Sequence, residues 1–114
     1  MPEYKTILER AYNALMQAGV DVRLATRHTG VCEAPYCVIY EGEAETGKSI
    51  AVRRLLADVL VPAAKPELLS GQMERIRAAM KAADFSPGLT GAAVALEDYK
   101  AVSATMEFVA LCAL

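Results

Sequence analysis

The chain has 114 residues, 54% hydrophobic and 23% charged, which is enough material for one core and predicts a single domain over residues 1–114. Its 12 basic and 14 acidic residues give a net charge of −2, and this balance argues against direct nucleic-acid binding, which needs a basic surface. No apolar run is long enough to span a membrane and the first residues lack a signal-peptide core, so we expect a soluble, intracellular protein.

The first third of the chain predicts a helix followed by two strands. Apolar residues recur at helical spacing over residues 3–18, and Gly19 follows them as the usual C-terminal stop. Residues 20–26 alternate between apolar and polar side chains, as a half-buried strand does. The polar segment 27–35 predicts a loop, and residues 36–42, rich in β-branched and aromatic side chains, predict the second strand.

Candidate metal ligands lie close together in this region: His28, Cys32 and Cys37. Structural zinc usually takes four ligands, commonly with a C-x-x-C pair, and this spacing supplies neither the pair nor the fourth ligand. Cys37 also lies within an apolar strand, where a free cysteine behaves as a small hydrophobe. We therefore expect no bound metal. With Cys112 the cysteines make an odd number in an intracellular chain, so we expect no disulfide framework either.

The sequence contains no recognisable catalytic set. The single histidine, His28, cannot be assigned to a triad without an identified nucleophile and an orienting acid. Cys32 is the nearest candidate nucleophile, and a thiol in a loop is the simpler interpretation. We therefore expect a protein that is not an enzyme and that binds no cofactor.

Residues 42–49, GEAETGKS, match the phosphate-binding pattern G-x-x-x-x-G-K-[ST]. The fixed positions of the pattern are Gly42, Gly47, Lys48 and Ser49. In a P-loop, the lysine contacts the β- and γ-phosphates and the hydroxyl group binds Mg²⁺. The apolar residues before the match could be the strand that precedes such a loop.

Charge, composition and length argue against nucleotide binding by this segment. Glu43 and Glu45 lie within the loop and would repel a polyphosphate. The variable positions contain no further glycine to let the backbone approach the ligand. Only one βαβ unit fits after residue 36, whereas the doubly wound sheet of a P-loop enzyme needs several. We therefore interpret residues 42–49 as an exposed hairpin loop, with a small nucleotide-binding enzyme as the less favoured alternative.

Residues 50–61 are compatible with two structures. The apolar side chains form a helical stripe: Val52, Leu55, Leu56, Val59 and Leu60. In a strand, both faces would mix apolar and charged residues. Periodicity favours a helix, which a P-loop would also require, but the local pattern does not decide between them.

The next segment predicts a second helix. Pro66 at a first-turn position, followed by Glu67, indicates its beginning, and the apolar stripe ends near Asp84. Gly71 lies inside this helix, where glycine costs about 1 kcal/mol relative to alanine, so we expect a close backbone contact there.

The last part of the chain predicts a hairpin. Residues 89–98 and 99–114 alternate as strands, and Glu97–Asp98 is a natural turn between them. The second strand places apolar residues on one face. Its other face begins as polar and turns apolar at Val109 and Leu111.

The order of these elements resembles the tail terminator (tail completion) proteins of long-tailed bacteriophages, the family of the lambda-type minor tail protein U. Three segments carry the resemblance, and they are APYCVIYEGEAETG, RRLLADVLVPAAKPELLSGQMERIRAAM and YKAVSATMEFVAL. The resemblance covers nearly the whole chain and rests on element order and alternation rather than on an invariant motif.

The resemblance implies an α+β fold with a mainly antiparallel sheet of about four to five strands and two helices packed on one face. It implies that residues 50–61 are a strand. It also implies a structural virion protein of a phage or prophage, assembled in the host cytoplasm, that forms a hexameric ring at the head-proximal end of the tail. Such a ring caps the tail tube, stops its polymerisation and docks on the head connector.

The partners implied by the resemblance are further copies of the chain, the tail tube protein and the head connector, with nucleic acid only as the content of a DNA channel. Contacts between subunits would use the loops at 27–35 and 43–49 and the exposed side of the long strands. Candidate contact residues on these strands are Arg53, Arg54, Asp58, Val109 and Leu111. A head-completion or neck adaptor protein is the alternative of the same size and class.

We expect the protein to bind Mg-ATP or Mg-GTP no better than background, because Glu43 and Glu45 would repel the polyphosphate. Isothermal titration calorimetry on the wild type and on Lys48→Ala measures this directly. A saturable micromolar signal that the variant loses would overturn the hairpin interpretation of residues 42–49.

Overall fold

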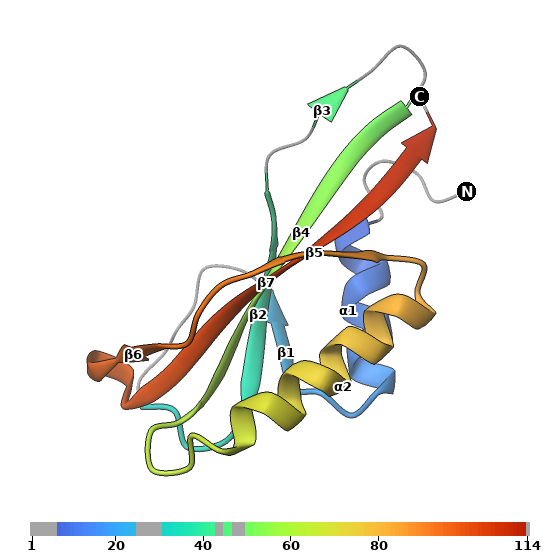
Figure 1. Ribbon diagram of the computed structural model, residues 1–114. Coiled ribbons are helices and arrows are strands. Elements are labelled where there is room, and N and C mark those ends of the chain that lie inside the picture. Colours follow the sequence, from blue (N-terminus) through green and yellow to red (C-terminus); the bar gives the residue numbers. More distant parts are fainter. Residues whose placement is uncertain (1–6, 25–30, 43–44, 47–49, 114) are drawn as a thin grey trace.

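The computed structural model describes residues 7–24, 31–42, 45–46 and 50–113, in which two helices pack on one face of a mostly antiparallel sheet (Figure 1). The helices are α1 (Ile7–Gln17) and α2 (Leu68–Ala82), with a short 3₁₀ helix, η2 (Glu97–Tyr99). The strands are β1 (Val22–Leu24), β2 (Tyr36–Glu41), β3 (Glu45–Thr46), β4 (Ile50–Pro62), β5 (Ser86–Thr90), β6 (Val94–Leu96) and β7 (Ala101–Ala113). The α+β class expected from the sequence is confirmed.

The sheet is built around the long strands β4 and β7. Its order is β1-β2-β4-β7-β5, with β3 added to β4 and β6 added to β7. Only the β1–β2 pair is parallel among these strands. The described residues thus form seven strands, more than the expected four to five, because β1, β3, β5 and β6 are short additions to the central strands.

β4 corrects the helix that periodicity favoured for residues 50–61. This segment is a strand of 13 residues that pairs with β2 on one side and with β7 on the other. From Ala51 to Val61 every odd-numbered residue is buried, and the even-numbered residues other than Leu60 are half-buried. A central strand that is covered on both faces carries apolar side chains on both faces. In this sequence, the resulting pattern of apolar residues resembles the stripe of an amphipathic helix.

The main core lies between the helices and one face of the sheet. α1 contributes Ile7, Ala11 and Leu15, which are four residues apart along the helix and fully buried. They pack with α2 against the odd-numbered residues of β4 and the even-numbered residues of β7. Burial of each large aliphatic side chain in this layer contributes about 1.5–3 kcal/mol. The helices are therefore held on the sheet by one continuous apolar layer.

A smaller second cluster lies on the opposite face, at the end of the sheet near η2. Its buried members are Cys32, Tyr36, Val38, Leu60 and Ala101, with Leu96 and Tyr99 packed against them. The backbone N–H of Cys32 donates to the carbonyl oxygen of Tyr99 at 2.7 Å and joins the chain before β2 to η2. This end of the second face is thus covered by η2 and by the chain before β2, whereas α1 and α2 lie on the other face.

The predicted ends of the first elements are confirmed in part. α1 ends where Gly19 adopts a left-handed conformation with φ of 79°, and the N–H of Val20 closes the end by donating to the carbonyl of Leu15 at 3.0 Å. β1 is shorter than the predicted strand 20–26, whose last two positions lie outside the described residues, as do residues 1–6.

The C-terminal elements differ more from expectation. α2 begins at Leu68 rather than at Pro66. The single strand predicted for residues 89–98 is wrong, because β5 and β6 are separate strands and β5 begins earlier. Pro87 lies inside β5, which an edge strand tolerates because its outer side needs no donor. The predicted turn at Glu97–Asp98 is confirmed as η2.

Two glycines show opposite surroundings. The close backbone contact expected at Gly71 is wrong, since a Cβ there would meet nothing within 4 Å. A Cβ on Gly88 would lie 2.5 Å from Oε1 and 2.9 Å from Cγ of Glu107. Gly88 therefore makes room for the side chain of Glu107 across the sheet.

We expect Gly71→Ala to raise the free energy of unfolding by about 0.5–1 kcal/mol, because alanine is the better helix former and has space. Gly88→Ala, the matched variant, should lower it, because Glu107 must move. Urea denaturation of both variants measures the two changes. If both substitutions changed the free energy of unfolding equally and with the same sign, the crowding at Gly88 would not affect stability.

Candidate functional site

The face of the sheet opposite the helices is uncovered beyond the second cluster. Residues paired across an antiparallel ladder point to the same side, so the register of β4 with β2 and β7 defines which side chains lie there. We call this surface the open face. It consists of Tyr40, Val52, Arg54, Leu56, Asp58, Thr105, Glu107, Val109 and Leu111. Leu111 is 62% exposed and the others are half-buried.

The open face brings together four of the residues expected from the sequence to contact another subunit. They are Arg54, Asp58, Val109 and Leu111. Arg53 does not join them, because neighbouring residues of a strand point to opposite sides. Its side chain is 7% exposed on the helix side and forms an ion pair with Glu41. Contact with another subunit stays a prediction for all five.

Asp58 is held by two hydroxyl groups on the open face. Tyr40 Oη donates to Asp58 Oδ1 at 3.1 Å, and Thr105 Oγ1 donates to the same oxygen at 2.7 Å. Burial raises the pKa of Tyr40, and the Asp58 carboxylate raises it further, so Tyr40 remains a donor at neutral pH. These bonds link β2, β4 and β7 across the face. Tyr40 and Thr105 could not be predicted as partners of Asp58, because their approach depends on strand register.

A second charged pair lies beside this network. Arg54 Nε is 3.9 Å from Glu107 Oε2, and each side chain is about one quarter exposed, 27% and 24%. The register places Val109 opposite Arg54 and Leu56 opposite Glu107, so apolar side chains flank the pair. The charges of the open face therefore have partners within the chain, in an otherwise apolar surround.

The segment that matches the phosphate-binding pattern continues the sheet. The N–H of Gly42 donates to the carbonyl of Arg54 at 2.9 Å, and β3 pairs with Ala51 and Val52 of β4. A P-loop needs a helix after its last residue, whereas β4 begins at Ile50. Gly47, Lys48 and Ser49 lie outside the described residues. The described part of the segment therefore adds backbone pairing to β4 and lies between the strands β2 and β4 in the chain.

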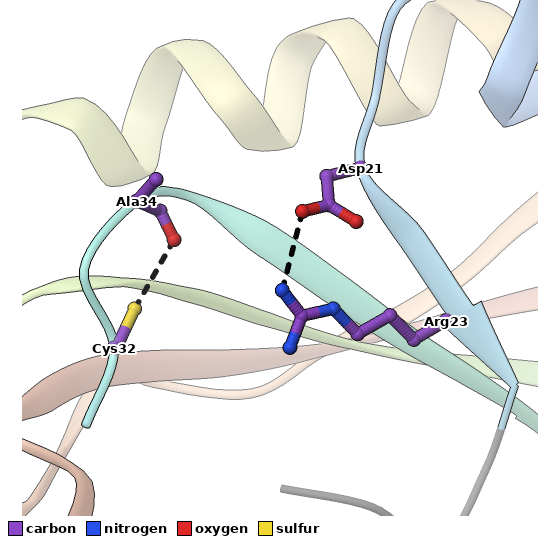
Figure 2. A network of polar contacts seen from close by, with 4 residues as sticks. All are labelled: Asp21, Arg23, Cys32 and Ala34. Atoms are coloured by element: carbon purple, nitrogen blue, oxygen red, sulfur yellow. Dashed lines mark hydrogen bonds and ion pairs between the residues drawn. The ribbon is translucent and has the colours of Figure 1, made fainter. Parts of the chain in front are cut away.

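The cysteines proposed and rejected as metal ligands lie on opposite faces of the sheet. Cys37 belongs to the main core and Cys32 to the second cluster, so the two thiols cannot share an ion. Figure 2 shows Cys32, whose Sγ donates to the carbonyl of Ala34 at 3.3 Å. Burial raises the pKa of both thiols, which disfavours the thiolate form that a metal or a nucleophilic reaction needs. His28 lies outside the described residues.

Arg23, on the edge strand β1, contacts two other side chains of the described chain. Its guanidinium lies 3.2 Å from Asp21 Oδ2 (Figure 2). The same group lies 3.9 Å from the centroid of the Tyr36 ring. This contact covers one side of the second cluster with a cation. It explains why Tyr36, at the end of β2, is buried next to an exposed edge.

Comparison with known proteins adds no family: no protein-family model and no curated protein sequence matches the chain. Within the described residues, no helix has the length and apolar character that a membrane crossing requires. Of the loops expected to contribute contacts, residues 27–30, 43–44 and 47–49 lie outside the described residues. The open face is thus the candidate site that the structure places on the sheet.

We expect stability to fall with rising pH because of Cys37, whose pKa burial raises to about 12 from an ordinary value of 9.0. Between these values the unfolded chain loses a proton that the folded chain keeps, so the contribution is complete below pH 9 and declines above it. The full difference corresponds to about 4 kcal/mol. Urea denaturation between about pH 8 and about pH 11 measures this contribution. The free energy of unfolding should fall less steeply with pH for Cys37→Ala than for the wild type.

Val59→Ala is the matched control, because Val59 is the cross-strand neighbour of Cys37, is equally buried and cannot ionise. It should lower stability at every pH without flattening the dependence. Identical pH dependence in the wild type and both variants would contradict the assignment to Cys37.

Proposed function

We propose that the protein is a structural virion subunit of a phage or prophage. It forms a ring that caps the tail tube, ends polymerisation of the tube and provides the tail side of the head–tail joint. The support is the resemblance in element order together with an α+β fold in which α1 and α2 pack on one face of the sheet. A structural role is also consistent with the described thiols, which burial keeps protonated.

The open face is the observation that carries this proposal. Apolar side chains surround its charged pairs, and they are Val52, Leu56, Val109 and Leu111. Because Arg54, Asp58 and Glu107 already have partners in the same chain, another protein can cover them without burying an unpaired charge. The surface is therefore suited to contact with a protein.

The shape of the subunit fits a ring. Its extents are 47 × 24 × 21 Å, and the β4–β7 ribbon continues beyond both helices (Figure 1). The open face follows this ribbon along the long axis, while the helices occupy the other side. A closed ring needs two different surfaces on each subunit, and the open face is one surface suited to this contact.

Within this proposal, the partners are further copies of the chain, the tail tube protein and the head connector. The ring lies at the head-proximal end of the tail and assembles in the host cytoplasm. DNA passes through its channel without being bound, which is consistent with a net charge of −2.

We expect the purified protein to form a ring of about six subunits, alone or on added tail tubes. Mass photometry at several concentrations and electron microscopy with purified tubes measure this. Leu111→Glu should weaken assembly because it places a charge on the open face. Met16→Glu is the matched control, since Met16 is 54% exposed on α1 and lies on the helix side.

A strict monomer that neither caps tubes nor joins a connector would refute the assignment. Rings that bind only the portal side of the head would favour the neck adaptor alternative. Equal loss of assembly in Leu111→Glu and Met16→Glu would show that the open face is not a specific contact surface of the ring.

A further inference from the structure

A groove with a basic rim lies between α2 and the first residues of β5. It has a volume of about 380 Å³ and is lined by Arg77, Lys81, Phe85, Ser86, Pro87 and Phe108. The aromatic rings are buried, with Phe85 3% and Phe108 2% exposed, and they form an apolar floor. Arg77 and Lys81 are exposed and one helical turn apart, so both side chains border the same side of the groove.

The cations of this groove lack partners within the described part of the chain. Neither Arg77 nor Lys81 forms an ion pair there. A third cation, the guanidinium of Arg10, stacks 4.6 Å from the centroid of the Phe85 ring. Two exposed acidic residues lie near the groove, namely Glu74, one helical turn before Arg77, and Asp84, which follows α2 in a left-handed conformation. The charged residues that line the groove itself are the cations Arg77 and Lys81, above an apolar floor.

The chain carries a complementary surface at its other end. η2 holds Glu97 and Asp98, both exposed and without an ion pair among the described residues. We call this turn the acidic corner. Its conformation is fixed, because Tyr99 packs against the second cluster and accepts the 2.7 Å hydrogen bond from Cys32. In Figure 1 it lies next to β6 at the left, whereas α2 ends at the right.

We propose that the acidic corner of one copy docks into the basic groove of the next copy. This inference rests on the proposed function, because a ring needs a contact between two different surfaces. The partner is a second copy of this chain because each chain carries both halves of the contact at opposite ends, and neither half forms an ion pair with another described residue. Fixed charges on both sides define the register and the association rate more than the affinity, and the apolar floor adds buried area.

The neighbouring edge of the sheet offers no competing mode of contact. β5 is an edge strand, which could in principle pair with a strand of another protein. Pro87 lacks a backbone N–H, and the register of β5 with β7 shifts between Pro87 and Thr90. Both features interrupt a regular edge. The contact at this side of the molecule is therefore made by side chains.

Charge reversal tests the inference. The groove variant Arg77→Glu, Lys81→Glu and the corner variant Glu97→Lys, Asp98→Lys should each weaken self-association at least about tenfold, because like charges then face each other. An equimolar mixture of the two variants should recover assembly. In the mixture, the reversed groove of one variant meets the reversed corner of the other, so that opposite charges face each other again. The variant with all four changes should recover assembly on its own.

The matched control is Lys65→Glu, Arg75→Glu, which makes the same change in net charge at exposed positions outside the groove. It should assemble as the wild type does. Thermal unfolding of every variant checks that each remains folded. Analytical ultracentrifugation gives the association constants, and wild-type assembly should weaken with added salt because exposed charges are screened.

The outcomes separate this inference from the proposed function. Assembly and tube capping that ignore charge reversal would overturn the inference and leave the proposed function intact. Recovery in the mixture without tube capping would support the inference and overturn the function. Loss in both variants with no recovery would exclude pairing of corner and groove, and a wild type that stays monomeric with and without tubes would overturn both.

Discussion

β4 and β7 pair over 13 residues each, and the other elements depend on this ribbon. One side of the ribbon provides the apolar layer on which both helices pack. Its other side forms most of the open face. The remaining strands add to its two edges, with β2 and β3 beside β4, and β5 and β6 beside β7. Loss of the ribbon would therefore remove the core and the candidate site together.

Successive side chains of β4 point to opposite faces of the sheet, so adjacent residues have different environments. Arg53 is buried with Glu41 on the helix side, while Arg54 meets Glu107 on the open face. A shift of register by one residue would exchange the two faces and bury the wrong set of charges. Asp58 opposes this shift, because its hydrogen bonds tie β4 to both neighbouring strands in one register only. The polar network thus specifies the fold as well as neutralising the surface.

The sequence predicted the elements whose signals are local. Periodicity identified both helices and β7, the β-branched and aromatic composition identified β2, and Gly19 marked the end of α1. β4 could not be assigned from its pattern, because a strand between two others carries apolar residues on both faces. The same ambiguity left Arg53 among the candidate contact residues. The partners Tyr40 and Thr105 of Asp58 were not predictable, since register arises from pairing between distant segments. The groove beside α2 depends on that pairing in the same way.

The distance along the chain between the two strands of the ribbon has a consequence for folding. Their nearest paired residues are Pro62 and Ala101, and α2, β5 and β6 lie between them. Bringing Pro62 and Ala101 together closes the intervening chain into a loop, which costs conformational entropy before the ladder forms. Each later residue pair, toward Ile50 and Ala113, adds little to this cost. We therefore expect the ladder to grow outward, with the end that carries Leu111 the last to form and the first to open. In the proposed ring, a partner that binds this end would select completed subunits over partly folded ones.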